Sequence, residues 1–369
     1  MQNLFIGSNS RFVTMLAIGL CFAKWGSAQQ EKNAANPQTV QLDSENAPSI
    51  GGKVLSSVLA PEPSETWTTP SLEGSHLQLI EELQLQNDET DPKYVTEVTR
   101  VAWRNGDPID LYIMKPVGVK KAPLVAYLLD YPHDNDAFLK PELCRALAKK
   151  GLSAVFFATA LTGQRYQGRP MKEWFVSELP EALATSAHDV QMILDYLGNR
   201  GDADVERTSV YGEGSGASIA ILAAAVDSRI KTLDLVSPWG DWPDWMAKST
   251  RIPENERANF LKPEFLGHTA PLDPVKWLPE LKTQRVRIRN VRSLTETPVT
   301  AQEKIEAVAP ANVEIVRYDN AQAYASAVTS EGPLGWIGQH LQHAAARHDR
   351  GNKSALSTNP SAKGGDSQR

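Results

Sequence analysis

Continuous apolar runs alternate with amphipathic stretches, and this pattern constrains the fold of the chain more than any other feature. The runs 124–129 and 154–158 flank the helix-like stretch 141–150, which ends at Gly151. Four more strand-like runs follow, at 208–211, 232–236, 285–291 and 313–318. Further helical stretches are expected at 178–197, 215–226, 301–308 and 334–346. Apolar runs joined by helices are typical of parallel strands buried on both faces. The sequence therefore predicts an α/β fold, a mostly parallel sheet with helices on both faces.

An antiparallel hairpin is predicted before this series. The segments 94–103 and 109–114 largely alternate polar and apolar residues, and they flank the dipeptide Asn105-Gly106. Asn-Gly favours the tight turns that join antiparallel strands. The sheet is therefore expected to begin with antiparallel strands.

The two ends of the chain differ from its body. Arg11, the apolar run 12–23 and the small residues before Ala28 are typical of an export signal, and the run is too short to span a membrane. Cleavage after Ala28 predicts a periplasmic or secreted product without a membrane span, whereas a retained signal would be an anchor. Residues 29–70 and 350–369 are polar and aperiodic, so the folded domain is expected at 71–349.

Charge and cysteine content narrow the function classes. Cleavage removes two of the 38 basic residues and none of the 44 acidic ones, which leaves a formal charge of −8. Such a chain lacks the basic surface that nucleic acid or anionic lipid requires, so a small molecule is the expected partner. Only Cys144 remains after cleavage, so no internal disulfide is expected. No cluster of residues has metal-ligand spacing, and neither a metal nor a cofactor is predicted.

The motif Gly212-Glu-Gly214-Ser-Gly216 stands between the apolar run 208–211 and the helical stretch 215–226. It resembles the strand, sharp turn and helix of the α/β hydrolases, in which small outer residues allow close approach and the central side chain is the nucleophile. With the order of the other elements, segment 71–349 is similar to the dienelactone hydrolases and acetyl esterases. The resemblance implies an α/β-hydrolase fold, a cap segment at about 239–283, and ester or acyl hydrolysis.

The catalytic positions that this resemblance implies are unsuitable in this chain. Gly214 stands in place of the serine, and Leu294 stands where the acid is expected, four residues before Pro298. The segment around Gln322, where the histidine is expected, contains none. Acyl transfer needs a nucleophile, a base and a group that orients the base. Two alternatives remain: a pseudoenzyme that binds a small molecule or partner, or an active ester hydrolase with a rearranged site.

A rearranged site would draw on neighbouring residues. Ser215 carries a hydroxyl one position after Gly214, and Asp241 follows the strand-like run 232–236. His133, in an acidic loop, is a candidate base, because nearby carboxylates favour its protonated form. Glu296 could replace the missing acid, although a glutamate before a helix more often complements its N-terminus.

Ligand contacts are expected at the carboxyl edge of the sheet, where open parallel sheets bind their ligands. Trp239, Trp242 and Trp245 lie in the cap segment and are predicted to wall a pocket, or else to pin the cap to the body. Pro243 favours an irregular loop there. Tyr131 and Arg165 follow strand-like runs that end at the same edge.

A dinucleotide site is the rival interpretation. Gly212-Glu-Gly214-Ser-Gly-Ala217 also fits the Gly-x-Gly-x-x-Ala fingerprint, with Asp234 about 20 residues further on. The fingerprint normally opens the first βαβ unit, whereas here two strand-like runs and a hairpin precede it. This interpretation is therefore the less favoured one.

Overall fold

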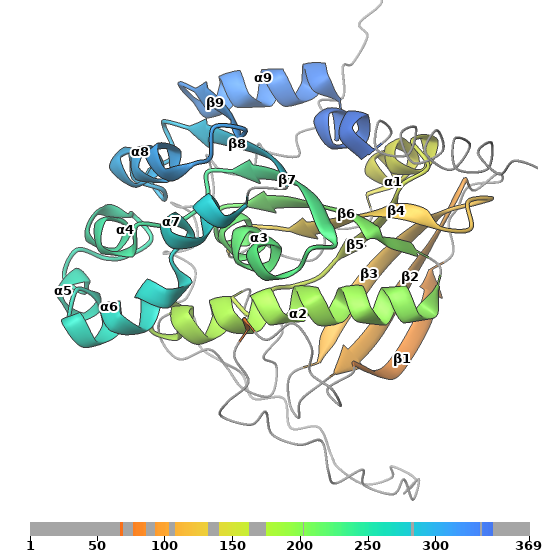
Figure 1. Ribbon diagram of the computed structural model, residues 1–369, viewed down its shortest axis with the longest axis horizontal. Coiled ribbons are helices and arrows are strands. Elements are labelled where there is room, and N and C mark those ends of the chain that lie inside the picture. Colours follow the sequence, from red (N-terminus) through yellow and green to blue (C-terminus); the bar gives the residue numbers. More distant parts are fainter. Residues whose placement is uncertain are drawn as a thin grey trace, which may run out of the picture.

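The computed structural model describes residues 67–68, 77–85, 93–102, 108–131, 140–161, 175–201, 203–281, 284–332 and 334–341. Within these ranges one mixed sheet runs through the molecule in the strand order β1-β2-β3-β5-β4-β6-β7-β8-β9 (Figure 1). The strands are β1 (Gln78–Leu85), β2 (Tyr94–Ala102), β3 (Ile109–Pro116), β4 (Ala122–Leu128), β5 (Ser153–Phe156), β6 (Ala203–Glu213), β7 (Ile230–Val236), β8 (Arg285–Val291) and β9 (Glu314–Tyr318).

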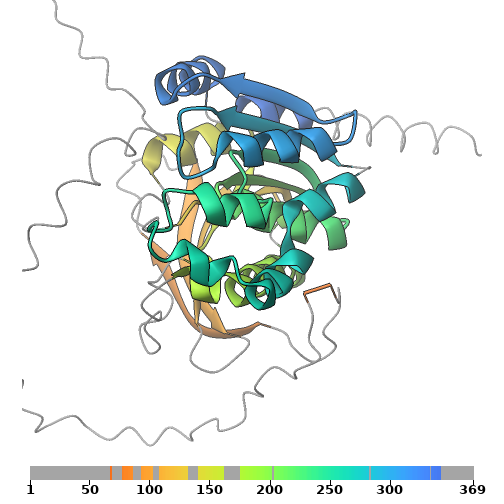
Figure 2. The ribbon, with the colours of Figure 1, turned by 90° about the vertical axis from the view of Figure 1, so that its left-hand side faces the viewer.

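Helices connect these strands and cover the sheet. They are α1 (Pro141–Lys149), α2 (Leu179–Arg200), α3 (Ser215–Val226), α4 (Trp242–Lys248), α5 (Arg257–Phe260), α6 (Pro263–Thr269), α7 (Pro274–Trp277), α8 (Val299–Val308) and α9 (Ala321–Glu331). The 3-10 turns are η4 (Phe175–Glu178), η5 (Ala270–Leu272) and η6 (Leu278–Glu280), and residues 335–341 are also helical. Helices α4 to α7 all fall between β7 and β8, and Figure 2 views the molecule from the side on which they lie.

The sheet has an antiparallel and a parallel part. Strands β1, β2 and β3 pair in antiparallel fashion, and β3 pairs in the same way with β5. From β5 onward all neighbours are parallel. The predicted hairpin and the predicted parallel sheet are both confirmed.

The core lies on both faces of the sheet, as the continuous apolar runs require. On one face α2, α3 and Ile305 of α8 pack against strand residues such as Leu124, Val210 and Ile288. On the other face α1, Tyr324 of α9 and Ile337 pack against Tyr127 and Phe156. The core on this second face also contains the hydroxyl groups of Tyr211 and Tyr324, and Tyr211 bonds Glu213.

Strand β1 and helices α9 and α4 are among the elements that differ from the prediction. Strand β1 was not predicted, because its residues are nearly all exposed and therefore carry no pattern of a buried face. The segment around Gln322 was not predicted to be helical but lies in α9, where the Asn320 side chain caps the helix by accepting the Ala323 N–H at 2.9 Å. The loop expected around Pro243 is helix α4; Pro243 stands in its first turn, where an N–H would lack a helical partner anyway.

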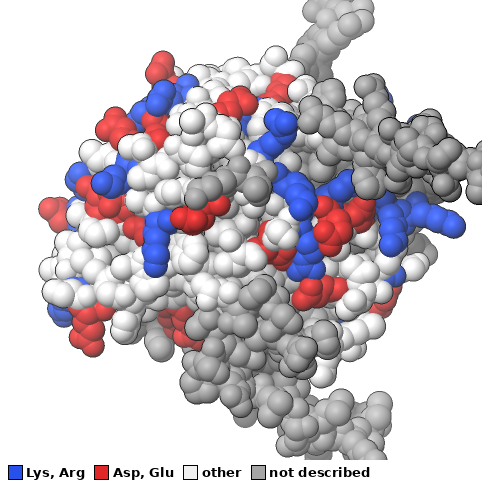
Figure 3. All heavy atoms as spheres, in the orientation of Figure 1, with Lys and Arg blue, Asp and Glu red and all other residues white. Residues whose placement is uncertain are grey.

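The predicted export signal, the polar lead-in and the polar tail lie essentially outside the described residues. Within the described part of the chain, no helix combines the length and the apolar character needed to cross a membrane. On the face seen in Figure 3, basic and acidic side chains are interspersed.

Candidate functional site

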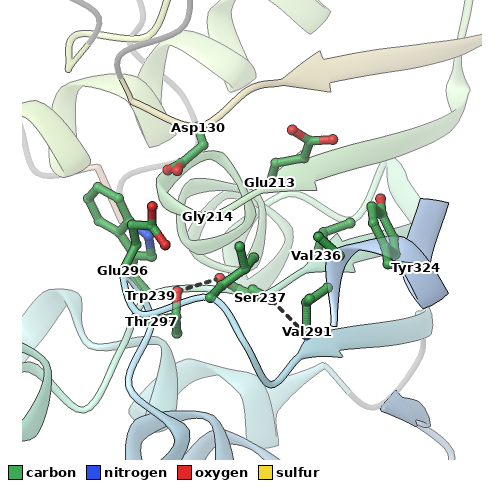
Figure 4. Close-up of a pocket in the computed structure, with 12 residues that line it drawn as sticks. Asp130, Glu213, Gly214, Val236, Ser237, Trp239, Val291, Glu296, Thr297 and Tyr324 are labelled. Atoms are coloured by element: carbon green, nitrogen blue, oxygen red, sulfur yellow. Dashed lines mark hydrogen bonds between the residues drawn. The ribbon is translucent and has the colours of Figure 1, made fainter. Parts of the chain in front are cut away.

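The carboxyl ends of the parallel strands surround a cavity of about 40 Å³. Figure 4 shows how its walls come from the ends of β6, β7 and β8 and from the segments that follow β4 and β9. The lining residues are Asp130, Glu213, Gly214, Val236, Ser237, Trp239, Val291, Leu294, Glu296, Thr297, Ala321 and Tyr324. The cavity therefore lies at the edge where ligands of open parallel sheets bind.

The turn between β6 and α3 forms one wall. Gly214 has φ 49° and ψ −113°, a conformation that residues with side chains rarely adopt, and its N–H donates to Val236 O at 2.9 Å. A Cβ on Gly212 would lie 2.6 Å from Ala217 Cα, and one on Gly216 would lie 2.2 Å from Leu128 O. The three glycines thus allow a sharp turn tightly packed between strand and helix.

The carboxylate of Asp130 lies directly against this turn. Oδ1 of Asp130 accepts the backbone N–H of Ser215 at 2.8 Å and the Ser215 hydroxyl at 3.1 Å. A Cβ built on Gly214 would lie only 2.1 Å from the same oxygen, and Figure 4 shows the carboxylate pointing toward Gly214. The first-turn N–H of a helix attracts negative charge, so the N-terminus of α3 stabilises this carboxylate.

A second contact holds Asp130 from the opposite side. Arg251, in the segment after α4, donates from Nη2 to Asp130 Oδ2 at 3.0 Å, and its guanidinium lies 5.9 Å from the Trp239 ring centroid. The N–H of Tyr131 donates to the Ser215 hydroxyl oxygen at 3.0 Å. The loop after β4, the turn before α3 and the segment after α4 are therefore joined through one carboxylate. Burial raises the pKa of Tyr131, and Arg251 partly offsets this increase.

The segments after β8 and β9 complete the cavity. Leu294 and Glu296 come from the first, and Ala321 and Tyr324 from the second. The described histidines, His188, His268 and His340, are not among the lining residues. His340 contacts Trp336 O through Nδ1 at 2.8 Å, outside the cavity. The Ser215 hydroxyl bonds Asp130 and the N–H of Tyr131, and no described histidine is among its hydrogen-bond partners.

A buried polar network lies next to the cavity. The Tyr211 hydroxyl donates to Glu213, and the Tyr211 and Tyr324 hydroxyl oxygens are 3.2 Å apart. The Arg289 guanidinium lies 5.6 Å from the Tyr211 ring centroid and 5.3 Å from that of Tyr324. Burial raises the pKa of both tyrosines, so both remain neutral at ordinary pH.

Asp234, the acid that the dinucleotide interpretation required, belongs to the same buried network. Asp234 accepts from Arg287 Nε at 3.0 Å and Nη2 at 2.8 Å, and from Arg289 Nη2 at 2.9 Å. Burial alone would lower the pKa of Arg289, but Asp234 and its other neighbours raise it overall. Asp234 is a buried ion-pair partner. The network was not predicted, although the alternation of arginines in 285–289 indicates that one face of β8 is polar.

The predicted ligand contacts are only partly brought together. All three tryptophans are buried in the core, with exposures of 1% or less, and of the three only Trp239 lines the cavity. The ring centroid of Trp245 lies 4.7 Å from that of Trp239 and 5.7 Å from that of Trp242. Tyr131 is half-buried and contacts the site through its backbone. His133 and Arg165 lie outside the described residues.

The predicted acid Asp241 lies at the start of α4 and does not line the cavity. Its N–H donates to Asp273 Oδ1 at 3.0 Å. Burial, then the neighbouring Asp273 and Asp244, raise the pKa of Asp241 above its ordinary value. Among the described residues, no group of three or more His, Cys, Asp and Glu could hold a metal ion.

Comparison with known proteins shows the fold. Acetyl xylan esterase from Paenibacillus sp. R4 superimposes with a TM-score of 0.53 and 16% identity, over 68% of this chain and 84% of the esterase. Acetyl xylan esterase 1 from Thermoanaerobacterium sp. JW/SL YS485 superimposes with a TM-score of 0.50 and 13% identity, over 65% of this chain and 81% of the esterase. A prolyl endopeptidase structure superimposes with a TM-score of 0.54 and 14% identity, over 68% of this chain but only 39% of that protein.

The protein therefore has an α/β-hydrolase fold, one that esterases and peptidases share. No family model matches its sequence, and no curated protein matches it. A fold of this kind hosts many functions, so the function has to be argued from the site.

Proposed function

We propose that this protein is an exported, non-catalytic protein of the α/β-hydrolase fold that binds a small molecule in the cavity at the carboxyl edge of its sheet. The observation that carries the proposal is the position of Asp130. Its carboxylate accepts the N–H of Ser215 at 2.8 Å and fills the space in which a side chain at position 214 would stand. A nucleophile and an incoming acyl group would both need that space.

The donors that an ester hydrolase would use are already bonded. Hydrolases of this fold stabilise the developing oxyanion with the N–H of the residue after the nucleophile and an N–H from an earlier loop. The corresponding groups here are the N–H of Ser215, which donates to Asp130, and that of Tyr131, which donates to the Ser215 hydroxyl oxygen at 3.0 Å. To reach both donors, an acyl oxygen would have to displace the buried, ion-paired carboxylate of Asp130 and the hydroxyl of Ser215.

The positions of the acid and the base support the same conclusion. The cavity wall at the expected acid position carries Leu294, and α9 contributes Ala321 and Tyr324 where a histidine is expected. Tyr324 is neutral, because burial raises its pKa, and its hydroxyl lies 3.2 Å from that of Tyr211. A neutral, internally bonded phenol is a poor general base.

Ester hydrolysis by a rearranged site, with Ser215, Asp241 and His133, is the alternative that the test must separate. Purified protein should be assayed with short p-nitrophenyl esters and labelled with a fluorophosphonate, beside a Ser215→Ala variant. We expect the two proteins to release p-nitrophenol at the same background rate and neither to be labelled. Saturable turnover or labelling that disappears in Ser215→Ala would overturn the proposal.

Export is the second part of the proposal. It is supported by the sequence of residues 1–28, which lie outside the described part of the chain. The mature protein isolated from its native cells should begin at Gln29. An intact N-terminus in a cytoplasmic fraction would contradict export without affecting the proposed binding.

A further inference from the structure

The charged side chains that line the cavity are acidic, whereas an ester-hydrolysing site has to stabilise negative charge on the substrate. An ester that is being hydrolysed develops negative charge on oxygen, which hydrogen-bond donors stabilise. The charged side chains that line this cavity are Asp130, Glu213 and Glu296, and none of its described lining residues is a lysine, arginine or histidine. The lining therefore offers a negatively charged ligand no positively charged side chain.

Most donors of the wall are already bonded within the protein. The N–H of Gly214 donates to Val236 O at 2.9 Å, and that of Ser237 donates to Arg289 O at 3.0 Å. The N–H of Val291 donates to the Ser237 hydroxyl oxygen at 3.1 Å. The Ser237 hydroxyl can itself donate or accept, so it does not favour either sign of charge. The wall thus offers little to an anion.

The three carboxylates differ in what remains available to a ligand. Asp130 is paired with Arg251 and hydrogen-bonded to Ser215. Glu213 is 8% exposed and accepts from the Tyr211 hydroxyl. Glu296 is half-buried, and its carboxylate has no partner among the described residues. Because a carboxylate can accept several hydrogen bonds, Glu296 is the anchor that a cationic ligand would use.

The rest of the wall suits a short apolar group. Val236, Val291 and Leu294 supply aliphatic surface, and Trp239 and Tyr324 supply aromatic rings. Aromatic faces attract cations as well as apolar groups. A volume of about 40 Å³ limits the bound group to a few non-hydrogen atoms.

We propose that the cavity binds a small organic cation, a primary ammonium on a short alkyl chain. The ammonium group donates to Glu296, and the alkyl chain contacts Val236, Val291 and Leu294. This inference rests on the proposed function, binding without turnover, and it adds the chemical class of the ligand.

The test compares three ligands of similar size and different charge. Binding of propylammonium chloride, 1-propanol and sodium propionate to the purified protein is measured by calorimetry at equal, low ionic strength. We expect propylammonium to bind in the millimolar range and at least about tenfold more tightly than either of the others. Glu296→Gln should weaken propylammonium binding about fivefold, as expected for a partly exposed charge pair.

The matched control is Glu303→Gln. Glu303 is 59% exposed, pairs with Arg292 at 3.4 Å and does not line the cavity, so the change should leave the affinity unaltered. Equal binding of 1-propanol or propionate would overturn the inference and leave binding without turnover intact. Propylammonium binding that Glu296→Gln does not change, or an absence of binding at tens of millimolar, would also overturn it. Ester turnover would instead contradict the proposed function.

Discussion

The carboxylate of Asp130 and the backbone of Gly214 share a space that has no room for a side chain at position 214. A Cβ on Gly214 would lie 2.1 Å from Asp130 Oδ1 and 2.3 Å from Asp130 Cγ. Gly214 therefore permits Asp130 to bond the first-turn N–H of α3, and Asp130 in turn excludes any nucleophile at that position. The two residues depend on each other, so changing one alone should be costly.

Gly214→Ser should lower the free energy of unfolding by about 2 kcal/mol or more, because a positive φ and a steric overlap add together. Urea unfolding of the purified variant measures the loss. Gly118→Ser is the matched control, since Gly118 has φ 83° but nothing within 4 Å of its Cβ position; its cost should be about 1 kcal/mol. In the double variant Gly214→Ser/Asp130→Gly the overlap is absent although the Asp130 contacts are also lost, so its total loss should be smaller than the sum of the two single losses by about the excess over this control. Equal losses for the two serine variants would contradict the overlap.

The ion pair between Asp130 and Arg251 should matter more than a surface pair. The two side chains are 8% and 18% exposed, so Asp130→Ala leaves a largely buried guanidinium and the N–H of Ser215 without their partner. We expect a loss of about 3 kcal/mol. Asp204→Ala, which breaks a 25–30% exposed pair with Arg207, should cost less than about 1 kcal/mol. A double-mutant cycle with Arg251→Ala should yield clear coupling; additive losses would show that the pair is energetically unimportant.

Asp241 predicts a dependence of stability on pH. Burial, Asp273 and Asp244 raise its folded-state pKa above the ordinary value of 3.8. The folded state then binds a proton more tightly than the unfolded chain, so stability falls as pH rises from 3.8 through the folded-state pKa. Asp241→Asn removes this charge and should unfold at a higher temperature at pH 7.

The increase in unfolding temperature caused by Asp241→Asn should become smaller as the pH falls through the folded-state pKa of Asp241. Any increase that remains at low pH would come from the left-handed backbone of residue 241, φ 52°, which asparagine tolerates well. Thermal unfolding between pH 3.5 and 7 measures both parts. Glu254→Gln, which removes one acid from an exposed position, is the control. An advantage independent of pH would contradict the raised pKa.

The central parallel strands could be predicted because they are buried on both faces. Apolar runs such as 124–128 then stand out from their flanks, and α3 was predicted with the bounds Ser215–Val226 that it has in the structure. Strand β1 could not be predicted, since exposed residues carry no periodic pattern. The helix α9 was missed because its sequence, Ala321–Glu331, is rich in small residues and has few apolar side chains.

The site was harder to predict than the fold. The sequence pointed to Gly214 as a turn without a side chain, but not to Asp130 as the group that fills the vacant space. Asp130 is 85 residues from Ser215 and 121 from Arg251 along the chain, so no local pattern connects them. The role of the tryptophans was equally hidden, because a spacing of three residues indicates one helical face but not whether that face meets a cavity or the core.

The tryptophans supply the last prediction, because Trp239 lines the cavity and Trp245 does not. Trp245 is fully buried beside Trp239 and Trp242, so Trp245→Phe should lower the free energy of unfolding by about 1–3 kcal/mol. It should leave the affinity for propylammonium within about twofold, since its ring does not reach the ligand. Trp239→Phe should weaken binding about threefold, because phenylalanine is a poorer partner for a cation than tryptophan. Calorimetry and urea unfolding of both variants measure the two effects. Weaker binding in Trp245→Phe than in Trp239→Phe would mean that the ligand lies among the core tryptophans instead.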